Sequence, residues 1–153
     1  MIRQSSAASV VSLAADFYQQ ALVLHKQGEY EEAIKQLSLG LQADIEHKPL
    51  YLLARDVLGK LDGAEERRLF AIALAEFHEF QPFFDLGYHF IDTGNYLLAS
   101  AFLAKALRLK PDSVDAAYEL AFARMARFQI AEAIKALESV QYQDDFWAAY
   151  LYY

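Results

Sequence analysis

The segment DLGYHFIDTGNYLLASAFLAKALRLKPD, residues 85–112, places small residues at intervals among large aromatic and aliphatic ones. Gly87 and Ala99 lie within apolar stretches that have helical periodicity, whereas Gly94 and Pro111 interrupt those stretches. Two antiparallel helices approach closely only where side chains are small, so that large neighbours can interdigitate. The segment therefore predicts a tightly packed helical hairpin, with Gly94 in its turn and Pro111 at its end.

Composition and charge narrow the class of protein. The 153 residues are 56% hydrophobic and 14% aromatic, which favours a single folded domain over residues 1–153 rather than disorder. A formal net charge of −7 disfavours nucleic acid and anionic membrane surfaces, because both are bound through Lys and Arg. No apolar run reaches the ~18 residues that span a bilayer, so no membrane insertion is expected. The absence of cysteine excludes a disulfide framework and fits a cytoplasmic location.

An internal repeat accounts for the small residues. Ala33, Ala99 and Ala133 align as the same position in three of the successive units. The interval from Ala99 to Ala133 equals one repeat period of about 34 residues, whereas the interval from Ala33 to Ala99 is two residues short of two such periods. The pattern predicts nine helices, over residues 8–27, 30–43, 48–60, 64–79, 81–93, 96–109, 113–127 and 130–141 and from residue 144 onward.

With these features the chain resembles the tetratricopeptide repeat (TPR) family, a 34-residue helix–turn–helix with a W-x2-L-G-x2-Y…A-x3-F…P pattern. Residues 80–113 match best, at Phe83, Leu86, Gly87, Phe90, Gly94, Tyr96, Ala99, Leu103, Ala106 and Pro111. Residues 14–47 and 114–147 match at fewer positions, and residues 48–79 are degenerate, with Arg55 at a usual small position. The resemblance implies an all-α fold, a right-handed α-solenoid of about four stacked antiparallel helix pairs, followed at residues 144–153 by a terminal or truncated helix.

No arrangement of residues predicts catalysis, a cofactor or a metal site. His89 and Asp92 share a helix face and fit a surface pair. His78 and Glu79 lack the second histidine of the zinc-protease pattern H-E-x-x-H, and no phosphate-binding loop or nucleophile elbow occurs. The glutamates of EYEEA and GAEERR fit solvated first turns of helices, where the helix dipole favours negative charge. The sequence therefore predicts a protein that is not an enzyme.

In the TPR family the first helix of each unit lines a concave groove, and the resemblance transfers that role to eleven positions here. These positions are Tyr18, Leu22, His25, Leu52, Asp56, Phe84, Tyr88, Asp92, Tyr118, Phe122 and Met125, with Asp85, Asp115 and Glu119 near the edges. The Lys, Arg and Asn clamp with which some TPR proteins hold a C-terminal carboxylate is absent. Exposed Tyr, Phe and Met are typical of peptide-binding surfaces, although the same side chains could pack against neighbouring helices of the chain instead.

The resemblance implies a non-enzymatic interaction module that binds a peptide or helix of a partner protein in an aromatic groove with an acidic border. Two alternatives remain open. One is a structural scaffold, as a fragment of a longer TPR solenoid. The other is a TPR-type secretion chaperone that shields apolar segments of exported proteins.

The last twelve residues contain six of the 22 aromatic residues, namely Tyr142, Phe146, Trp147, Tyr150, Tyr152 and Tyr153. Repeat arrays normally end in a capping helix with a polar outer face, so this end has three explanations. In the first explanation the chain is part of a longer array. In the second the aromatic residues pack against a second copy of the chain, and in the third they fold back as a cap. The first two predict an exposed apolar surface and therefore concentration-dependent homodimers through Trp147, Tyr150 and Tyr152.

Overall fold

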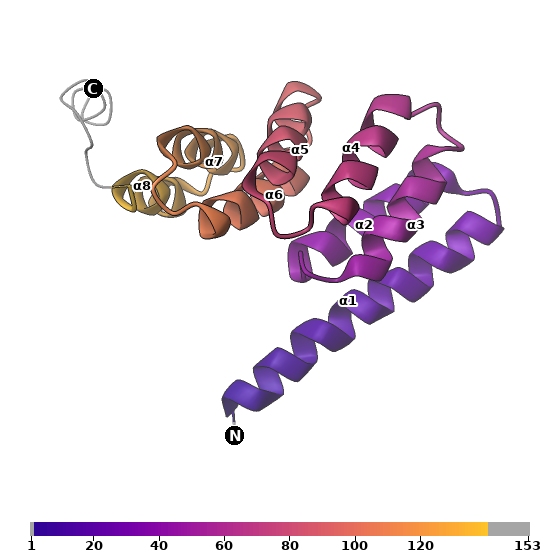
Figure 1. The fold of residues 1–153 in the computed structure, drawn as a ribbon. Helices are drawn as coiled ribbons and strands as arrows, with labels where there is room; N and C mark the ends of the chain where they lie inside the picture. The colour runs from indigo at the N-terminus through magenta and orange to yellow at the C-terminus, as the bar shows by residue number, and fades with distance from the viewer. Residues whose placement is uncertain (1, 141–153) are drawn as a thin grey trace. The chain divides into compact units, whose positions relative to one another are not determined.

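The structure, a computed structural model, describes residues 2–140, where α-helices are joined by short turns and no strand occurs (Figure 1). Its helices are α1 (Ile2–Lys26), α2 (Tyr30–Ala43), α3 (Lys48–Leu58), α4 (Ala64–Ala75), α5 (Phe80–Asp92), α6 (Tyr96–Leu109), α7 (Val114–Ala126) and α8 (Ile130–Glu138). The predicted all-α fold class is confirmed. The chain divides into two compact units, residues 1–77 and 78–153, and each is described by itself.

Most predicted helix ends lie within two residues of the observed ones. The first helix begins at Ile2 rather than at residue 8, because no Pro or Gly interrupts the chain up to Lys26. The fourth ends at Ala75 rather than at residue 79, because the backbone leaves the helical conformation at Glu76 and buries Phe77. The eighth ends at Glu138, three residues before its predicted end. The ninth predicted helix, from residue 144, lies outside the described residues.

Each unit consists of two helical hairpins that pack on one another. In the first unit α1 pairs with α2 and α3 with α4, while α3 also packs against α2 and, less extensively, against α1. The second unit repeats the scheme, because α5 pairs with α6, α7 pairs with α8, and α7 packs against both α6 and α5. This stacking follows from the apolar face that one hairpin cannot cover alone.

The hairpin turns show that all four repeats share one geometry. Each turn contains one residue with a left-handed backbone conformation, and these residues are Gly28, Asp62, Gly94 and Phe128. In every turn the following residue donates its N–H to the carbonyl oxygen five residues earlier, at 2.8–3.0 Å. The turn residues recur with a period of about 34 residues, except that the interval from Asp62 to Gly94 is shorter by two. The two residues missing from the repeat spacing are therefore lost between the second and the third turn.

The small residues allow close helix contact within both units. A Cβ atom added at Gly87 would lie 2.4 Å from Cγ of Leu103, and one added at Gly40 would lie 2.9 Å from Cδ1 of Leu50. The three alanines that align the repeats are at most 1% exposed. The steric reason inferred from the sequence for these residues therefore agrees with the observed contacts.

Candidate functional site

The eleven predicted groove residues all lie on α1, α3, α5 and α7, the first helices of the four hairpins, and none of them is buried. Leu52, Asp56, Tyr88, Asp92, Phe122 and Met125 are exposed, and Tyr18, Leu22, His25, Phe84 and Tyr118 are half-buried. Five of the eleven belong to the first unit and six to the second. The first helices thus keep these side chains accessible, while other residues of the same helices form the core.

Aromatic rings stack along α5 in the second unit. The ring centroids of Phe80 and Phe84 are 5.5 Å apart with an interplanar angle of 25°, and those of Phe84 and Tyr88 are 6.3 Å apart with an angle of 27°. The spacing of four residues puts these three side chains on one helix face, which we call the α5 ladder. Phe80 is not among the residues predicted from the sequence, although its spacing from Phe84 is the signal that could have revealed it.

The neighbouring helix α7 presents a second apolar stripe, made of Tyr118, Phe122 and Met125. Phe122 is 47% exposed and Met125 is 53% exposed. The ring of Phe122 also meets Tyr96, at the start of α6, in a T-shaped contact with a centroid distance of 6.2 Å. Because α5 and α7 contact one another, the α5 ladder and the α7 stripe belong to adjacent helices of one unit.

Acidic residues accompany these two stripes. The pKa of Glu119 on α7 is raised from its ordinary value, first by burial and then by the negative charges of Asp115 and Asp92. Asp92 lies at the end of α5, so its influence on Glu119 brings carboxylates of both helices together. The acidic border predicted from the sequence thus includes a group of mutually repelling charges in the second unit.

The raised pKa of Glu119 gives a testable dependence of stability on pH. A carboxyl whose folded pKa exceeds its unfolded value of 4.5 stabilises the fold fully below that pH, and this contribution is lost as the pH rises through the folded pKa. We therefore expect Glu119→Gln to raise the midpoint of urea unfolding at pH 7, with a smaller difference from the wild type near pH 4. A variant that is no more stable than the wild type at pH 7 would contradict the assigned cost of a charged Glu119, which burial and the neighbouring carboxylates Asp115 and Asp92 produce.

In the first unit, two of the predicted residues make ring contacts with their own unit. Tyr18 lies 6.4 Å from His47 between ring centroids, and His25 lies 5.6 Å from Tyr30. Leu52 on α3 is 47% exposed. The side chains of Tyr18 and His25 on α1 thus pack within the chain, which is the alternative that the sequence left open. On α3, by contrast, the apolar side chain of Leu52 is exposed.

The described residues include the histidines and the acidic stretches noted in the sequence. Within them, no group of three or more His, Cys, Asp or Glu residues could hold a metal ion. The ring of His89 packs edge-on against Phe90 at 5.3 Å. Glu32 and Glu65, from the two acidic stretches, form exposed ion pairs one turn along their own helices, at 2.8 and 2.7 Å. Of the helices described, none is long and apolar enough to cross a membrane.

The stacked hairpins of residues 2–140 define a helical repeat protein. The Tetratricopeptide repeat family model matches residues 90–152, a region that begins within α5. The predicted resemblance to the TPR family is therefore confirmed, and proteins of this family are generally non-enzymatic modules that bind protein partners. No curated protein matches the sequence.

Two solved structures are similar over most of the chain. One, "MamA RS-1 ArsTM double mutant", is 18% identical with a TM-score of 0.47, and the match covers 90% of this chain and 84% of that chain. The other, "MamA 41-end from Desulfovibrio magneticus RS-1", is 19% identical with a TM-score of 0.46, and the match covers 94% and 90%. At these values the similarity supports no statement about what this chain binds.

Proposed function

We propose that this chain is a non-enzymatic, cytoplasmic interaction module that binds a peptide or helix of a partner protein on the outward faces of its first helices. The observation that supports this most is the exposure of Tyr88, Phe122 and Met125, each about half accessible on α5 and α7. Large apolar side chains in such positions supply much of the binding free energy at protein interfaces.

The α5 ladder suits this role because its rings are already ordered. Phe84 is stacked between Phe80 and Tyr88, so these side chains lose little conformational freedom when a partner binds. The nearby carboxylates of Asp92 and Glu119 would attract Lys or Arg. The preferred partner is therefore an amphipathic helix or an extended segment that combines apolar anchors with basic flanks.

In this proposal the first unit contributes fewer binding residues than the second. Leu52 and Asp56 on α3 repeat the combination of an apolar residue with a carboxylate one helical turn away. Tyr18, Leu22 and His25 on α1 are less accessible. We therefore assign the main anchoring role to the second unit.

A capture experiment with two variants tests the proposal. The wild-type chain is expected to retain a partner from lysate, and the partner segment is then prepared as a synthetic peptide. Tyr88→Ala and Phe122→Ala should each weaken binding of that peptide by more than ~1 kcal/mol, since they truncate hot-spot side chains. Ile134→Ala is the matched control, because Ile134 is 49% exposed but lies on α8, a second helix.

The outcomes separate the candidate roles. Normal binding by both variants, with their helicity retained, would place the site elsewhere. A chain that captures nothing would favour the scaffold alternative, and capture of apolar segments of exported proteins would favour the secretion chaperone. The homodimer predicted through Trp147, Tyr150 and Tyr152 is a separate prediction, because these residues lie outside residues 2–140.

A further inference from the structure

Phe128 lies in the turn between α7 and α8, in a state that neither the stability of the fold nor solubility in water favours. Its backbone is left-handed, with φ 62°, and its side chain is 89% exposed. Of the four left-handed turn residues in the described chain, two are glycines and one is Asp62, and both residue types tolerate this conformation. A bulky residue is strained there, and strain that the fold does not require indicates a function for the side chain.

Two more apolar side chains are exposed directly after this turn. Ile130 and Ile134 are each 49% exposed and lie one helical turn apart on α8. Exposed apolar side chains that are grouped rather than scattered mark interaction sites. We call Phe128, Ile130 and Ile134 the fourth-turn surface.

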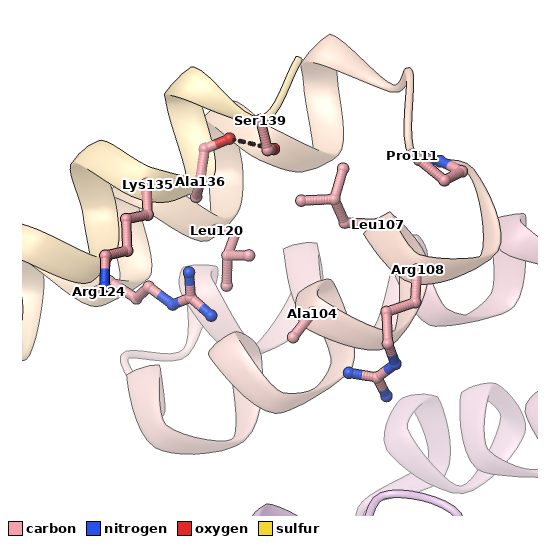
Figure 2. A pocket seen from close by; sticks show the side chains of 9 residues that line it. All are labelled: Ala104, Leu107, Arg108, Pro111, Leu120, Arg124, Lys135, Ala136 and Ser139. Carbon is pink, nitrogen blue, oxygen red and sulfur yellow. Dashed lines mark hydrogen bonds between the residues drawn. The ribbon is translucent and has the colours of Figure 1, made fainter.

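The two helices that this turn joins also bring cations together. A pocket of about 650 Å³ opens between α6, α7 and α8 (Figure 2). Figure 2 shows Arg124 from α7 and Lys135 from α8 on one side of this pocket, and Arg108 from α6 on the other. Both helices next to the fourth-turn surface thus contribute positive charge, in a chain whose net charge is −7.

Arg124 and Arg127 keep their charge although both make hydrogen bonds. Nη1 of Arg124 donates to the carbonyl oxygen of Glu132 at 3.1 Å, and Nη1 of Arg127 donates to Oγ of Ser100 at 3.1 Å. These acceptors are uncharged, so the bonds orient the guanidinium groups without neutralising them. The carboxylate of Glu132 offsets part of the charge, whereas Arg127 adds to the positive potential at Arg124. The end of α7 is therefore basic.

The α5 ladder and the α7 stripe of the same chain carry the opposite charge. Tyr88 and Phe122 are exposed there, as are the carboxylates of Asp92 and Asp115. The negative charges of both aspartates act on the half-buried Glu119. A cation placed among these groups would relieve their mutual repulsion. Because two copies with a net charge of −7 repel one another, only a contact between oppositely charged surfaces is favoured.

We propose that the fourth-turn surface of one copy of this chain binds to the α5 ladder and the α7 stripe of a second copy. Phe128 would pack among the exposed apolar side chains there, and Arg124 and Arg127 would face the carboxylates. The inference rests on the proposed function, because it names the partner segment of that same face. The turn has the chemistry that the face prefers, namely apolar anchors with basic flanks.

Sedimentation of the full wild-type chain over a range of concentrations, with no partner added, tests the proposal. We expect self-association that increases with concentration and weakens as salt is raised, because exposed charges contribute to the attraction. Phe128→Gly should weaken it at least ~10-fold, since it removes a hot-spot side chain. The same change should raise the midpoint of urea unfolding of the dilute monomer, because glycine adopts the left-handed conformation without strain. A purely structural role for Phe128 would not combine weaker association with greater stability.

Asp62→Gly is the matched control. It makes the same kind of change at the left-handed position of another turn, in the first unit. It should leave the self-association unchanged.

An exchange of charges identifies the two surfaces that meet. Arg124→Glu with Arg127→Glu should be monomeric, and so should Asp92→Lys with Asp115→Lys, because like charges then face one another. An equimolar mixture of these two variants should associate again, since the basic turn of the second variant faces the acidic residues of the first. Circular dichroism verifies that each variant keeps its helices, and recovery in the mixture excludes misfolding as the cause.

Other outcomes overturn the proposal. A wild-type chain that stays monomeric at all concentrations would do so, as would self-association that Phe128→Gly or Tyr88→Ala leaves intact, or a mixture that does not associate. Association lost only in the triple variant Trp147→Ser, Tyr150→Ser, Tyr152→Ser would assign the contact to those residues instead. Failure of the proposed function is seen separately, because it is measured by the binding of a partner peptide and not by sedimentation of the chain alone.

Discussion

Gly87→Leu is expected to lower the free energy of unfolding by about 1–3 kcal/mol, the usual cost of overpacking a core. A Cβ atom alone at this position would lie 2.4 Å from Cγ and 2.6 Å from Cδ2 of Leu103. Leu103 is fully buried, so it has no space into which it could retreat. Helix propensity acts in the opposite direction, because leucine is favoured over glycine inside a helix by about 1 kcal/mol. A net loss of stability would therefore identify the steric contact as its cause.

Urea unfolding followed by circular dichroism measures this effect. Gly87→Ala tests the same contact with a single added carbon, and combining it with Leu103→Ala should cost less than the sum of the two single changes. Gly59→Ala is the control, because Gly59 is exposed at the end of α3 with φ −63°, a conformation open to any residue. If Gly87→Leu were as stable as the wild type, the helix register described for α5 and α6 would be incorrect.

The hairpins of the first and third repeats could be predicted because close helix contact leaves a local trace in the sequence. Only Gly or Ala fits where two backbones approach, and Gly28 and Gly94 supply the left-handed turn residue without strain. The spacing of small residues in the sequence therefore indicates where two helices contact one another. The prediction that the first helix of each pair lines a groove comes from the resemblance to the TPR family and not from this spacing.

The second repeat could not be predicted with the same certainty, because its sequence replaces these markers. Arg55 and Arg67 stand where the other hairpins have small residues, and Asp62 replaces the turn glycine. The hairpin forms nevertheless, and Tyr51 packs against Phe70 and Phe77 with centroid distances of 5.9 and 5.4 Å. Packing between rings so far apart in the sequence leaves no short-range spacing to detect.

The cationic residues around the α6–α7–α8 pocket could not be predicted from the sequence, because they come from several helices. Arg108, Arg124 and Lys135 lie on three different helices, and only the packing of α6, α7 and α8 brings them around one pocket. No periodicity along the chain indicates such a meeting. The residues of the α7 stripe, by contrast, lie at helical spacing within one helix, and the resemblance to the TPR family points to their positions.

Phe102→Ala is expected to have the largest effect on stability of all the substitutions considered. The Phe102 side chain is fully buried, and its ring lies 6.3 Å from that of Phe83 and 6.0 Å from that of Phe90. Truncation of a buried Phe to Ala removes its transfer free energy and leaves a cavity, a combined cost of about 3–5 kcal/mol. This is a large part of the ~5–15 kcal/mol by which domains are typically stable.

Because all three rings belong to the second unit, the loss should be local. The stability of stacked repeats is approximately the sum of the intrinsic stability of each repeat and the energies of the interfaces between neighbours. A destabilising substitution therefore acts mainly on its own and the adjacent hairpins. We expect amide hydrogen exchange to accelerate throughout α5–α8 while α1–α4 keep most of their protection. Phe128→Ala deletes the same atoms from a side chain that is 89% exposed, and it should change stability by no more than about 0.5 kcal/mol. Equal acceleration in both units after Phe102→Ala would show that they unfold as one cooperative body, since a core defect confined to one unit would then be felt by every helix.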